Sequence, residues 1–387
     1  MLSIELDLCK LPGLVQAADR LVNGTISSPC DTGEFSSLVD VSIPRLDAII
    51  CNAGIGGWTG INWPLATINF LTTGWVQATT YPTFKDTTPG LLVDGVSGRE
   101  TTAQAEADGG SDRLLGQVFC ANVFGHYLLG HALLPLLGRP AGSAVPPGRI
   151  ILESSVEAGM WDFLSLDDLQ AVRSHGAYES TKRLTDVLSL TAELPAVRPL
   201  SASYFREDKA SGRTPPRLYL THPGVVVTTL FPLNFVMYYL YLFSMYVSRW
   251  IGSPWHPVTA YLGAAAPVFV ALQSQSALDE AQAHRVKFGS ASDRLGHSAI
   301  KKTEVEGWGW EGRVEERDAL ARDPAVGILR NMVGRKTGAP LLTRERLEDF
   351  EALGAKCWAE MEALRRRWER LLASNVDGES GRQTKKS

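Results

Sequence analysis

The sequence predicts an α/β protein built on a doubly wound parallel sheet. Strand-like and helix-like segments alternate along most of the chain, which is the order of elements in such sheets. Three of the strand-like segments are largely apolar, as strands buried on both faces must be. Each of them ends in small or polar residues: Leu46–Cys51 before Asn52, Arg149–Glu153 before Ser154, and Arg217–His222 before Pro223. Ligands of parallel sheets bind beyond the carboxyl ends of the strands, so we expect a site there.

The segments between the strands fit helices and loops. Residues 118–137 are apolar at helical spacing and include Asn122, and residues 177–190 fit a second helix. Residues 75–111 contain several prolines and glycines, which predicts a loop-rich insertion. Residues 343–372 predict an amphipathic helix, because their apolar residues also recur at helical spacing.

Composition limits the class of protein. The chain has 387 residues, 44% hydrophobic and 21% charged, enough for one large domain and an extension. We expect a domain over residues 1–300 and an extension over 301–387, with a disordered tail after Ser374. A net charge of −4 without a basic cluster argues against nucleic acid. Five cysteines without paired spacing predict no metal site, and they favour a reducing compartment. The first residues carry charge and lack the apolar run of a signal peptide.

Tyr178 and Lys182 are the most informative pair in the chain. They lie four residues apart in a predicted helix, and four residues turn a helix by about 400°, so both side chains project from one face. An ammonium beside a phenol favours the phenolate, and such a tyrosine can exchange a proton with a carbonyl or alcohol oxygen. An exposed pair without a function has the same spacing. Ser155 lies upstream of the pair, at the end of a predicted strand, and this combination favours a catalytic site.

These motifs, in this order, resemble those of the short-chain dehydrogenase/reductase family. The resemblance covers about residues 3–290 and implies a Rossmann-like fold. It implies that Tyr178 is the proton donor and that Ser155 holds the substrate carbonyl oxygen. It also implies that Lys182 binds the nicotinamide ribose and joins a proton relay. Asn122 matches the residue that binds the relay water.

The same resemblance implies a cofactor site. Asn52, Ala53 and Gly54 match the family's N-A-G motif beside the cofactor, and Asp7 stands in the place of the acid that borders the adenine. Tyr178 and Lys182 also match cofactor contacts. The P-G-x-V-x-T segment at the nicotinamide end is matched by Pro223, Gly224, Val226 and Thr228. The implied cofactor is NADPH.

A narrower resemblance is to the fungal 3-ketosteroid reductases of sterol C4-demethylation. It rests on tryptophan-bearing segments, Trp58–Trp63 and Trp250–His256, and on the apolar run before the second. It implies reduction of a 3-keto sterol to the 3β-hydroxy sterol in ergosterol-type biosynthesis. Two alternatives stay open: a reductase of another lipid carbonyl, such as a 3-keto acyl group or retinal, and an inactive scaffold of the sterol-demethylating complex. The tetrad does not separate these, because the chemistry is shared.

The N-terminus departs from the family pattern. The family begins with a strand, a T-G-x-x-x-G-x-G turn and a helix, and then has a second strand and helix. Here the chain opens on a segment that resembles the third strand, Ile4–Leu8, followed by the third helix. No glycine-rich fingerprint precedes Asn52, so we expect the first two strands to be missing and Ile4–Leu8 to lack a sheet neighbour.

Residues 230–247 predict a membrane-associating segment. From Leu218 to Ser248 the chain has no Asp, Glu, Lys or Arg, and Leu230–Val247 is rich in Tyr, Phe and Leu. Pro232 and Asn234 leave an uninterrupted helix of about 15 residues, short of the roughly 20 that span a bilayer. A buried core helix is the alternative. We interpret the segment as a monotopic or re-entrant anchor on the cytosolic face of the endoplasmic reticulum or of lipid droplets, where other sterol C4-demethylation enzymes are possible partners.

Overall fold

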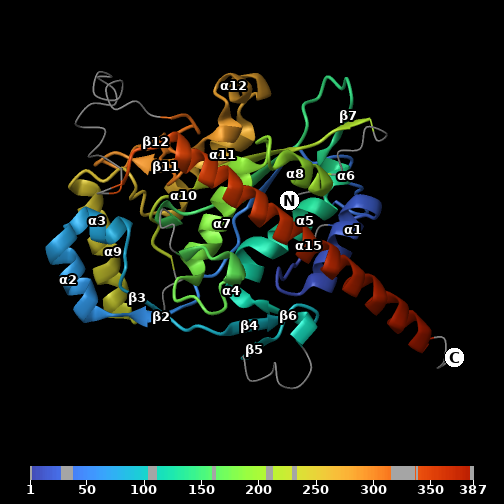
Figure 1. Cartoon of the computed structure of the whole chain (residues 1–387), viewed down its shortest axis with the longest axis horizontal. Helices are drawn as coiled ribbons and strands as arrows, with labels where there is room; N and C mark the ends of the chain where they lie inside the picture. Colours follow the sequence, from blue (N-terminus) through green and yellow to red (C-terminus); the bar gives the residue numbers. More distant parts are fainter. Residues whose placement is uncertain are drawn as a thin grey trace.

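The computed structural model describes residues 2–27, 38–102, 111–158, 163–205, 212–228, 233–314, 336 and 339–383, with side chains up to Ser374. Its centre is a five-stranded sheet in the order β1-β8-β10-β11-β12, seen in Figure 1. The first four strands are parallel to their neighbours, and β12 runs antiparallel to β11. A mixed, mainly parallel sheet with helices confirms the predicted α/β, Rossmann-like class. The strands are β1 (Ala48–Cys51), β8 (Arg149–Glu153), β10 (Arg217–His222), β11 (Lys287–Ser292) and β12 (Ser298–Thr303).

Helices cover both faces of this sheet. On one face α11 (Ala265–Leu272) packs over the central strands, where Val270 meets Ile151 and Tyr219 in a buried cluster. The other face carries the main hydrophobic core. Its helices are α1 (Leu11–Asn23), α4 (Gln117–Phe119), the π-helical turn Cys120–Phe124, α5 (Gly125–Ala132), α6 (Leu134–Leu137), α7 (Ala177–Thr191) and α8 (Arg198–Tyr204).

The C-terminal helix is part of the same core. α15 (Arg344–Gln383) crosses over α7 and α8 (Figure 1), and its Phe350, Trp358 and Trp368 are fully buried. The Trp358 indole donates a hydrogen bond to the Leu188 carbonyl on α7 at 3.1 Å. The helix continues to Gln383, past Ser374, where we expected a disordered tail.

The segment Ile4–Leu8 does not form a strand, so the expected third-strand element is wrong for this structure. A strand requires a neighbour for its N–H and C=O groups, and no described strand pairs with this segment. β1 lies at the edge of the sheet and pairs with β8. The predicted helix that follows is present as α1.

Residues 75–102 form short helices and strands joined by loops, so they are more ordered than the loop-rich insertion expected over 75–111, of which residues 103–110 lie outside the described residues. β2 (Trp58–Ile61) pairs with β3 (Lys85–Thr87), and α2 (Trp63–Thr73) and α3 (Trp75–Thr80) lie between them. The turn formers lie between elements and do not prevent them: Gly90, with φ +84°, is the last residue of the turn before the next strand. That strand belongs to a small antiparallel sheet of β5 (Glu100–Thr102), β4 (Leu91–Asp94) and β6 (Leu114–Gly116).

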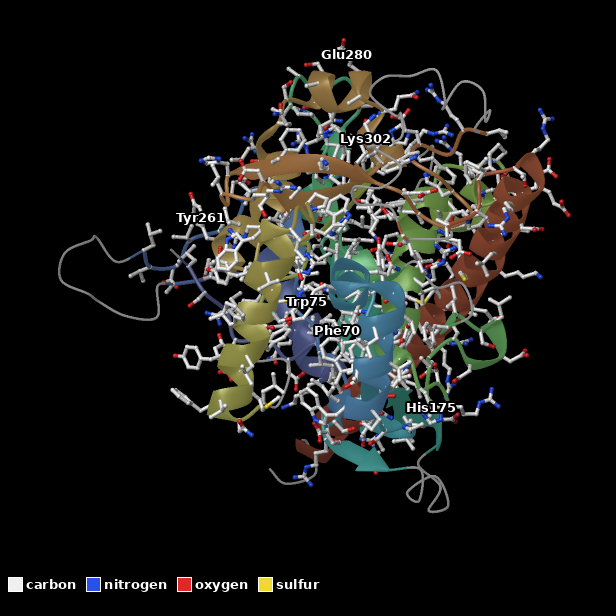
Figure 2. All side chains as sticks on the ribbon, turned by 90° about the vertical axis from the view of Figure 1, so that its left-hand side faces the viewer. Phe70, Trp75, His175, Tyr261, Glu280 and Lys302 are labelled. Carbon is white, nitrogen blue, oxygen red and sulfur yellow. The ribbon has the colours of Figure 1, made fainter. Side chains whose placement is uncertain are left out.

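The apolar segment after the third strand forms α9 (Phe235–Trp250), which Asn234 caps by accepting from the Met237 N–H at 3.0 Å. Residues 230–232 lie outside the described residues. α3 packs on α9: the Trp75 indole donates to the Ser244 carbonyl at 3.3 Å. Figures 1 and 2 show α2 and α9 together at one end of the molecule. Among the described helices, none combines the length and apolar character needed to cross a bilayer.

The remaining described elements are short and complete the outline. They comprise β7 (Arg139–Pro140), which pairs with β9 (Arg213–Thr214), and the helices α10 (Ala260–Gly263) and α12 (Gln275–Glu280).

Candidate active site

The predicted catalytic serine and tyrosine meet at the carboxyl end of β8. Ser155 is the second residue after this strand, and Tyr178 lies in the first turn of α7. The Ser155 hydroxyl lies close enough to the Tyr178 phenol to act on it, and its effect is to lower the phenol pKa. Two residues from different parts of the chain therefore face each other where a parallel sheet places its ligands.

The pKa of Tyr178 is nevertheless held above its ordinary value. Burial of the phenol is the largest cause, and the carboxylates of Glu157 and Glu179 add to it. The Ser155 hydroxyl and the charge of Lys85 oppose the shift without overcoming it. The sequence spacing predicted the opposite direction, with Lys182 lowering the phenol pKa, and the position of Lys182 explains the difference.

Lys182 projects toward the sheet rather than toward the phenol oxygen. Its Nζ donates a hydrogen bond to the Glu153 carbonyl at 2.8 Å and lies 5.6 Å from the Tyr178 ring centroid. Burial lowers the Lys182 pKa to about 8, and nearby Lys287 acts in the same direction, while Glu153 and Asp186 oppose it. Near neutral pH this lysine is therefore close to the point where it gains or loses a proton.

Asn122 joins the helix layer to the N-A-G turn. It lies in the π-helical turn, where its Oδ1 accepts from the Ile55 N–H at 2.7 Å and its Nδ2 donates to the Ile55 carbonyl at 2.9 Å. Nδ2 also lies 3.1 Å from the Thr181 hydroxyl on α7. The side chain thus holds the turn after β1 against the helix that carries Tyr178 and Lys182.

The Asn52–Gly54 turn is exposed at the end of β1, as a cofactor-binding turn must be. The Ala53 carbonyl lies 2.8 Å from the His126 Nε2. A Cβ on Gly54 would lie 2.6 Å from the Asn122 Oδ1, so only glycine allows this close approach. Burial lowers the His126 pKa, and sequence reasoning missed this histidine.

The Pro223–Thr228 segment follows β10 at the same edge of the sheet. Gly224 has φ +69°, and a Cβ there would lie 2.7 Å from Pro257. Val226 forms a bridge with Val258, and Val225 packs with Val156, which follows Ser155 in the chain. Thr228 is partly buried beyond this bridge.

The described contacts of Asp7 involve none of these site residues. Its carboxylate accepts from the Cys9 N–H at 2.8 Å and lies beside Gly98. The structure therefore brings together Asn122, Ser155, Tyr178, Lys182 and the two glycine-bearing turns, and it places Asp7 in a separate exposed turn.

Comparison with known proteins decides the family. No protein-family model matches the chain. A 3-keto-steroid reductase of Gibberella zeae is 47% identical over 376 residues, which cover 96% of this chain and 77% of the relative. A 3-keto-steroid reductase of Aspergillus fumigatus is 40% identical over 90% of this chain and 77% of its own length. That of Saccharomyces cerevisiae is 30% identical over 67% of this chain and 63% of its own length.

The chain belongs to the 3-keto-steroid reductase family.

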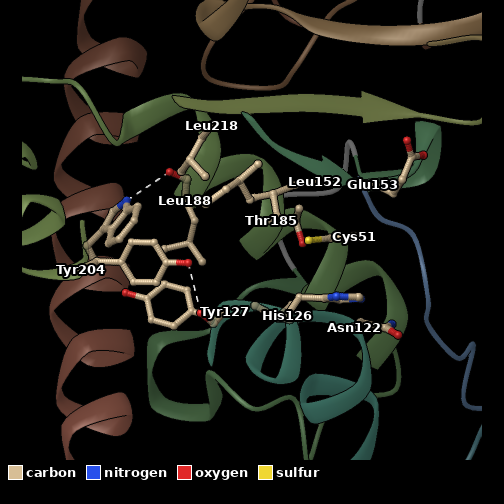
Figure 3. A pocket seen from close by; sticks show the side chains of 13 residues that line it. Cys51, Asn122, His126, Tyr127, Leu152, Glu153, Thr185, Leu188, Tyr204 and Leu218 are labelled. Atoms are coloured by element: carbon tan, nitrogen blue, oxygen red, sulfur yellow. Dashed lines mark hydrogen bonds between the residues drawn. The ribbon is translucent and has the colours of Figure 1, made fainter. Parts of the chain in front are cut away.

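Behind the site of this 3-keto-steroid reductase family member lies a buried charge cluster that the sequence pattern did not predict. Lys287 donates to the Asp186 carboxylate and to the Ser155 carbonyl, at 2.8 and 2.7 Å. Asp186 also accepts from the Ser154 hydroxyl. The cluster thus fixes the strand end that carries Ser155. Figure 3 shows the small cavity beside it, about 30 Å³, with Asn122, His126 and Glu153 among its lining residues.

Glu153, at the end of β8 beside this cluster, has a perturbed pKa. Burial raises its pKa to about 7, against the opposing effects of the Thr221 hydroxyl and of Lys182. Thr221 donates to Oε1, and among the described residues Oε2 accepts no hydrogen bond. A carboxyl in this state is protonated at mildly acidic pH.

Replacing Glu153 by Gln should flatten the pH dependence of stability. The folded chain binds the Glu153 proton up to about pH 7, whereas an unfolded glutamate releases it at its ordinary pKa of 4.5. Folded-state stability therefore falls as pH rises from about 4.5 to 7, by about 3 kcal/mol for this group. Glutamine carries no such proton, so this fall should be absent.

Chemical denaturation at pH 4.5, 6 and 7.5 measures the effect. The matched control is Glu280→Gln, because Glu280 is exposed at the end of α12. A Glu153→Gln slope equal to that of wild type and of the control would show that Glu153 is ionised in the folded state throughout this range.

Proposed function

We propose that this protein reduces a 3-keto steroid to the 3-hydroxy steroid, with Tyr178 as the proton donor and NADPH as the reductant. The observation that carries the proposal is that Ser155 and Tyr178 lie next to each other at the carboxyl edge of the sheet. The relatives named 3-keto-steroid reductase support the substrate class, with 47% and 40% identity over nearly the whole chain. By resemblance, the biological setting is ergosterol-type sterol C4-demethylation.

Each side chain of the site has a role in this reduction. The bound nicotinamide supplies a hydride to the carbonyl carbon, and the Tyr178 phenol gives its proton to the carbonyl oxygen, so that the ketone becomes an alcohol. A pKa above the ordinary value keeps Tyr178 in the protonated, donating form at neutral pH. The Ser155 hydroxyl, which lies next to the phenol, aligns the carbonyl oxygen. Lys182, with a pKa of about 8, can return a proton to the site.

The residues at the sheet edge fit the nicotinamide end of such a cofactor. At Gly54 and Gly224 a Cβ would clash with Asn122 or Pro257, so both turns need glycine to keep their shape at the edge where the nicotinamide would lie. Asn52–Gly54 and Pro223–Thr228 would border the nicotinamide, and Lys182 would approach its ribose after leaving the Glu153 carbonyl. NADPH rather than NADH is proposed from the resemblance.

A membrane-binding surface fits a steroid substrate. α2 and α9 together expose large apolar side chains, and residues 52–84 and 218–248 contain no Asp, Glu, Lys or Arg. Leu71 is 81% exposed and Phe235 is 76% exposed. We define this as the α2–α9 surface: Trp63, Leu65, Ile68, Leu71, Trp75, Phe235, Val236, Tyr239, Leu240, Phe243 and Trp250. Aliphatic side chains rimmed by Trp and Tyr suit a bilayer interface.

We infer that this surface holds the protein on the cytosolic face of the endoplasmic reticulum or of lipid droplets, beside other enzymes of sterol C4-demethylation. α3 packs on α9, and β2 and β3 link the α2–α3 pair to the Tyr178 site. A steroid dissolved in the bilayer would then reach the site from the membrane side. Such a placement explains why so much apolar surface lies next to the site.

Steroid-dependent oxidation of NADPH tests the function. Protein expressed from its own gene is mixed with NADPH and a 3-keto steroid in mixed micelles, and loss of absorbance at 340 nm is followed together with the 3-hydroxy product. We expect turnover with the 3-keto steroid and at least tenfold lower kcat/KM with a 3-keto acyl thioester or retinal. A preference for either of these substrates would assign the protein to another lipid carbonyl, and binding of steroid without turnover would favour a scaffold.

A further inference from the structure

Lys85 links the two segments that carry the candidate catalytic residues. It is the first residue of β3, and its side chain is only 4% exposed. Its Nζ pairs with the carboxylates of Glu157 and Glu179, the latter at 2.7 Å. Glu157 lies two residues after Ser155, and Glu179 directly follows Tyr178. One ammonium therefore bridges the end of β8 and the first turn of α7.

The same ammonium lies against the aromatic side of the site. Its Nζ is 4.3 Å from the Trp58 ring centroid and 5.3 Å from that of Tyr178, and these two rings are 4.7 Å apart. An ammonium at these distances from two rings gains cation–π stabilisation. Trp58 is on β2, which pairs with β3. This two-stranded sheet presents Trp58 and Lys85 together to Tyr178.

Lys85 also lines a cavity of about 190 Å³. Glu157, Glu179 and Lys85 form its polar wall, and Tyr81, Phe163 and His175 are among its other lining residues. Lys85 thus lines this cavity and also lies against the Tyr178 ring. Its ammonium already pairs with the carboxylates of Glu157 and Glu179, so Lys85 is placed to hold these two residues in position.

The geometry after Ser155 depends on these contacts. The Glu157 N–H donates to the Ser155 Oγ at 3.2 Å, so the position of Glu157 constrains the serine hydroxyl. The Glu157 and Glu179 side chains are 17% and 11% exposed. Without the ammonium, two poorly solvated carboxylates would face each other and repel, and the segments that carry them would separate.

We propose that Lys85 is a positioning residue of the reductase: by pairing with Glu157 and Glu179 at once, it holds the Ser155 hydroxyl and the Tyr178 phenol in the arrangement that engages one carbonyl oxygen. This proposal rests on the proposed function for its catalytic consequence. Its structural part, the clamp between the two segments, stands on the ion pairs themselves. Lys85 acts through its neighbours, which are the two carboxylates and the rings of Trp58 and Tyr178.

Lys85→Met tests the proposal, because Met keeps much of the side-chain length and removes the charge. We expect kcat for the 3-keto steroid to fall about 100-fold, the scale of loss when reacting groups are misplaced, while KM changes less than about threefold. Lys85→Arg keeps the charge and should recover most of the loss. The matched control is Lys302→Met. Lys302 lies on the edge strand β12 and also forms an ion pair, with Glu311.

Amide hydrogen exchange separates the clamp from the proposed function. Peptides over residues 153–158 and 177–183 should exchange at least tenfold faster in Lys85→Met than in wild type, and at near wild-type rates in Lys85→Arg and Lys302→Met. This readout needs no turnover, so it decides the clamp even if the wild-type protein does not reduce 3-keto steroids. Unchanged exchange in both peptides, or equal losses of kcat in the Met and Arg variants, overturns the proposal. If Lys85→Met does not fold, Glu179→Gln removes one of the two pairs and should give a smaller change in the same direction.

Discussion

Replacing Tyr178 by Phe should lower kcat for reduction of a 3-keto steroid by about 10²- to 10⁴-fold, the range for loss of a general acid. The phenol is the group proposed to give the proton to the carbonyl oxygen, and it lies next to Ser155 at the carboxyl end of β8. Phenylalanine retains the ring that packs against Trp58 at 4.7 Å, so the fold and the shape of the site should persist. Steady-state kinetics with the product identified by mass spectrometry measure the loss.

The control for this variant is Tyr219→Phe. Tyr219 is a buried tyrosine on β10 that faces the α11 layer, and its hydroxyl accepts a hydrogen bond from Gln275 at 2.9 Å. Loss of the Tyr219 hydroxyl should leave kcat within about twofold of the wild-type value, because Tyr219 lies on the opposite face of the sheet from α7. Turnover near the wild-type rate in Tyr178→Phe would remove the assigned proton donor and would contradict the mechanism. Cofactor affinity measured by fluorescence titration should be similar in the two variants.

Placing charge on the α2–α9 surface should release the protein from membranes. Leu240 and Phe243 on α9 are 56% and 58% exposed, so aspartates there are accommodated by the fold. Inserting one large apolar side chain into the bilayer contributes about 2 kcal/mol, and losing two lowers the partition coefficient by roughly a thousandfold. In flotation with liposomes of neutral phospholipid, wild-type protein should rise with the vesicles, and Leu240→Asp/Phe243→Asp should stay at the bottom.

A matched control uses an equally exposed leucine far from this surface. Leu272 is 79% exposed at the end of α11, beside the Val270 and Ala271 carbonyls that accept from Arg149 at the amino end of β8. Leu272→Asp should float like wild type. Wild-type protein that remains dispersed below the vesicles would show that the α2–α9 surface does not bind lipid, and equal flotation of all three proteins would place the contact elsewhere.

The sequence by itself determined the sheet class and the order of the site motifs. The three apolar runs became β1, β8 and β10 with nearly the expected bounds, because each run ends where small or polar residues begin. Burial on both faces holds for β8 and β10, whereas β1 lies at the edge of the sheet and leaves Ile50 42% exposed. The meeting of Ser155 with Tyr178 also followed, since parallel topology brings every strand end to one edge.

Only the tertiary structure decided the electrostatics of the site. Helical spacing placed Lys182 on the same face as Tyr178, but burial and the nearby Glu153 carbonyl direct its ammonium away from the phenol oxygen. The same burial reverses the expected direction of the Tyr178 pKa and raises that of Glu153 to about 7. A pKa depends on solvent exclusion and on charges that are distant in sequence, and local spacing contains neither.

Tertiary structure also decided what lies around the site. Lys85 belongs to a region that its prolines and glycines marked as loop, and only the pairing of β2 with β3 carries it to Glu157 and Glu179, 72 and 94 residues further along the chain. α2 lacked a recognisable signal for exposure, because an apolar helix has the same composition whether it is buried in a core or presented to a membrane. Which of the two it becomes depends on the area that its neighbours cover, and α3 and α9 leave most of α2 uncovered.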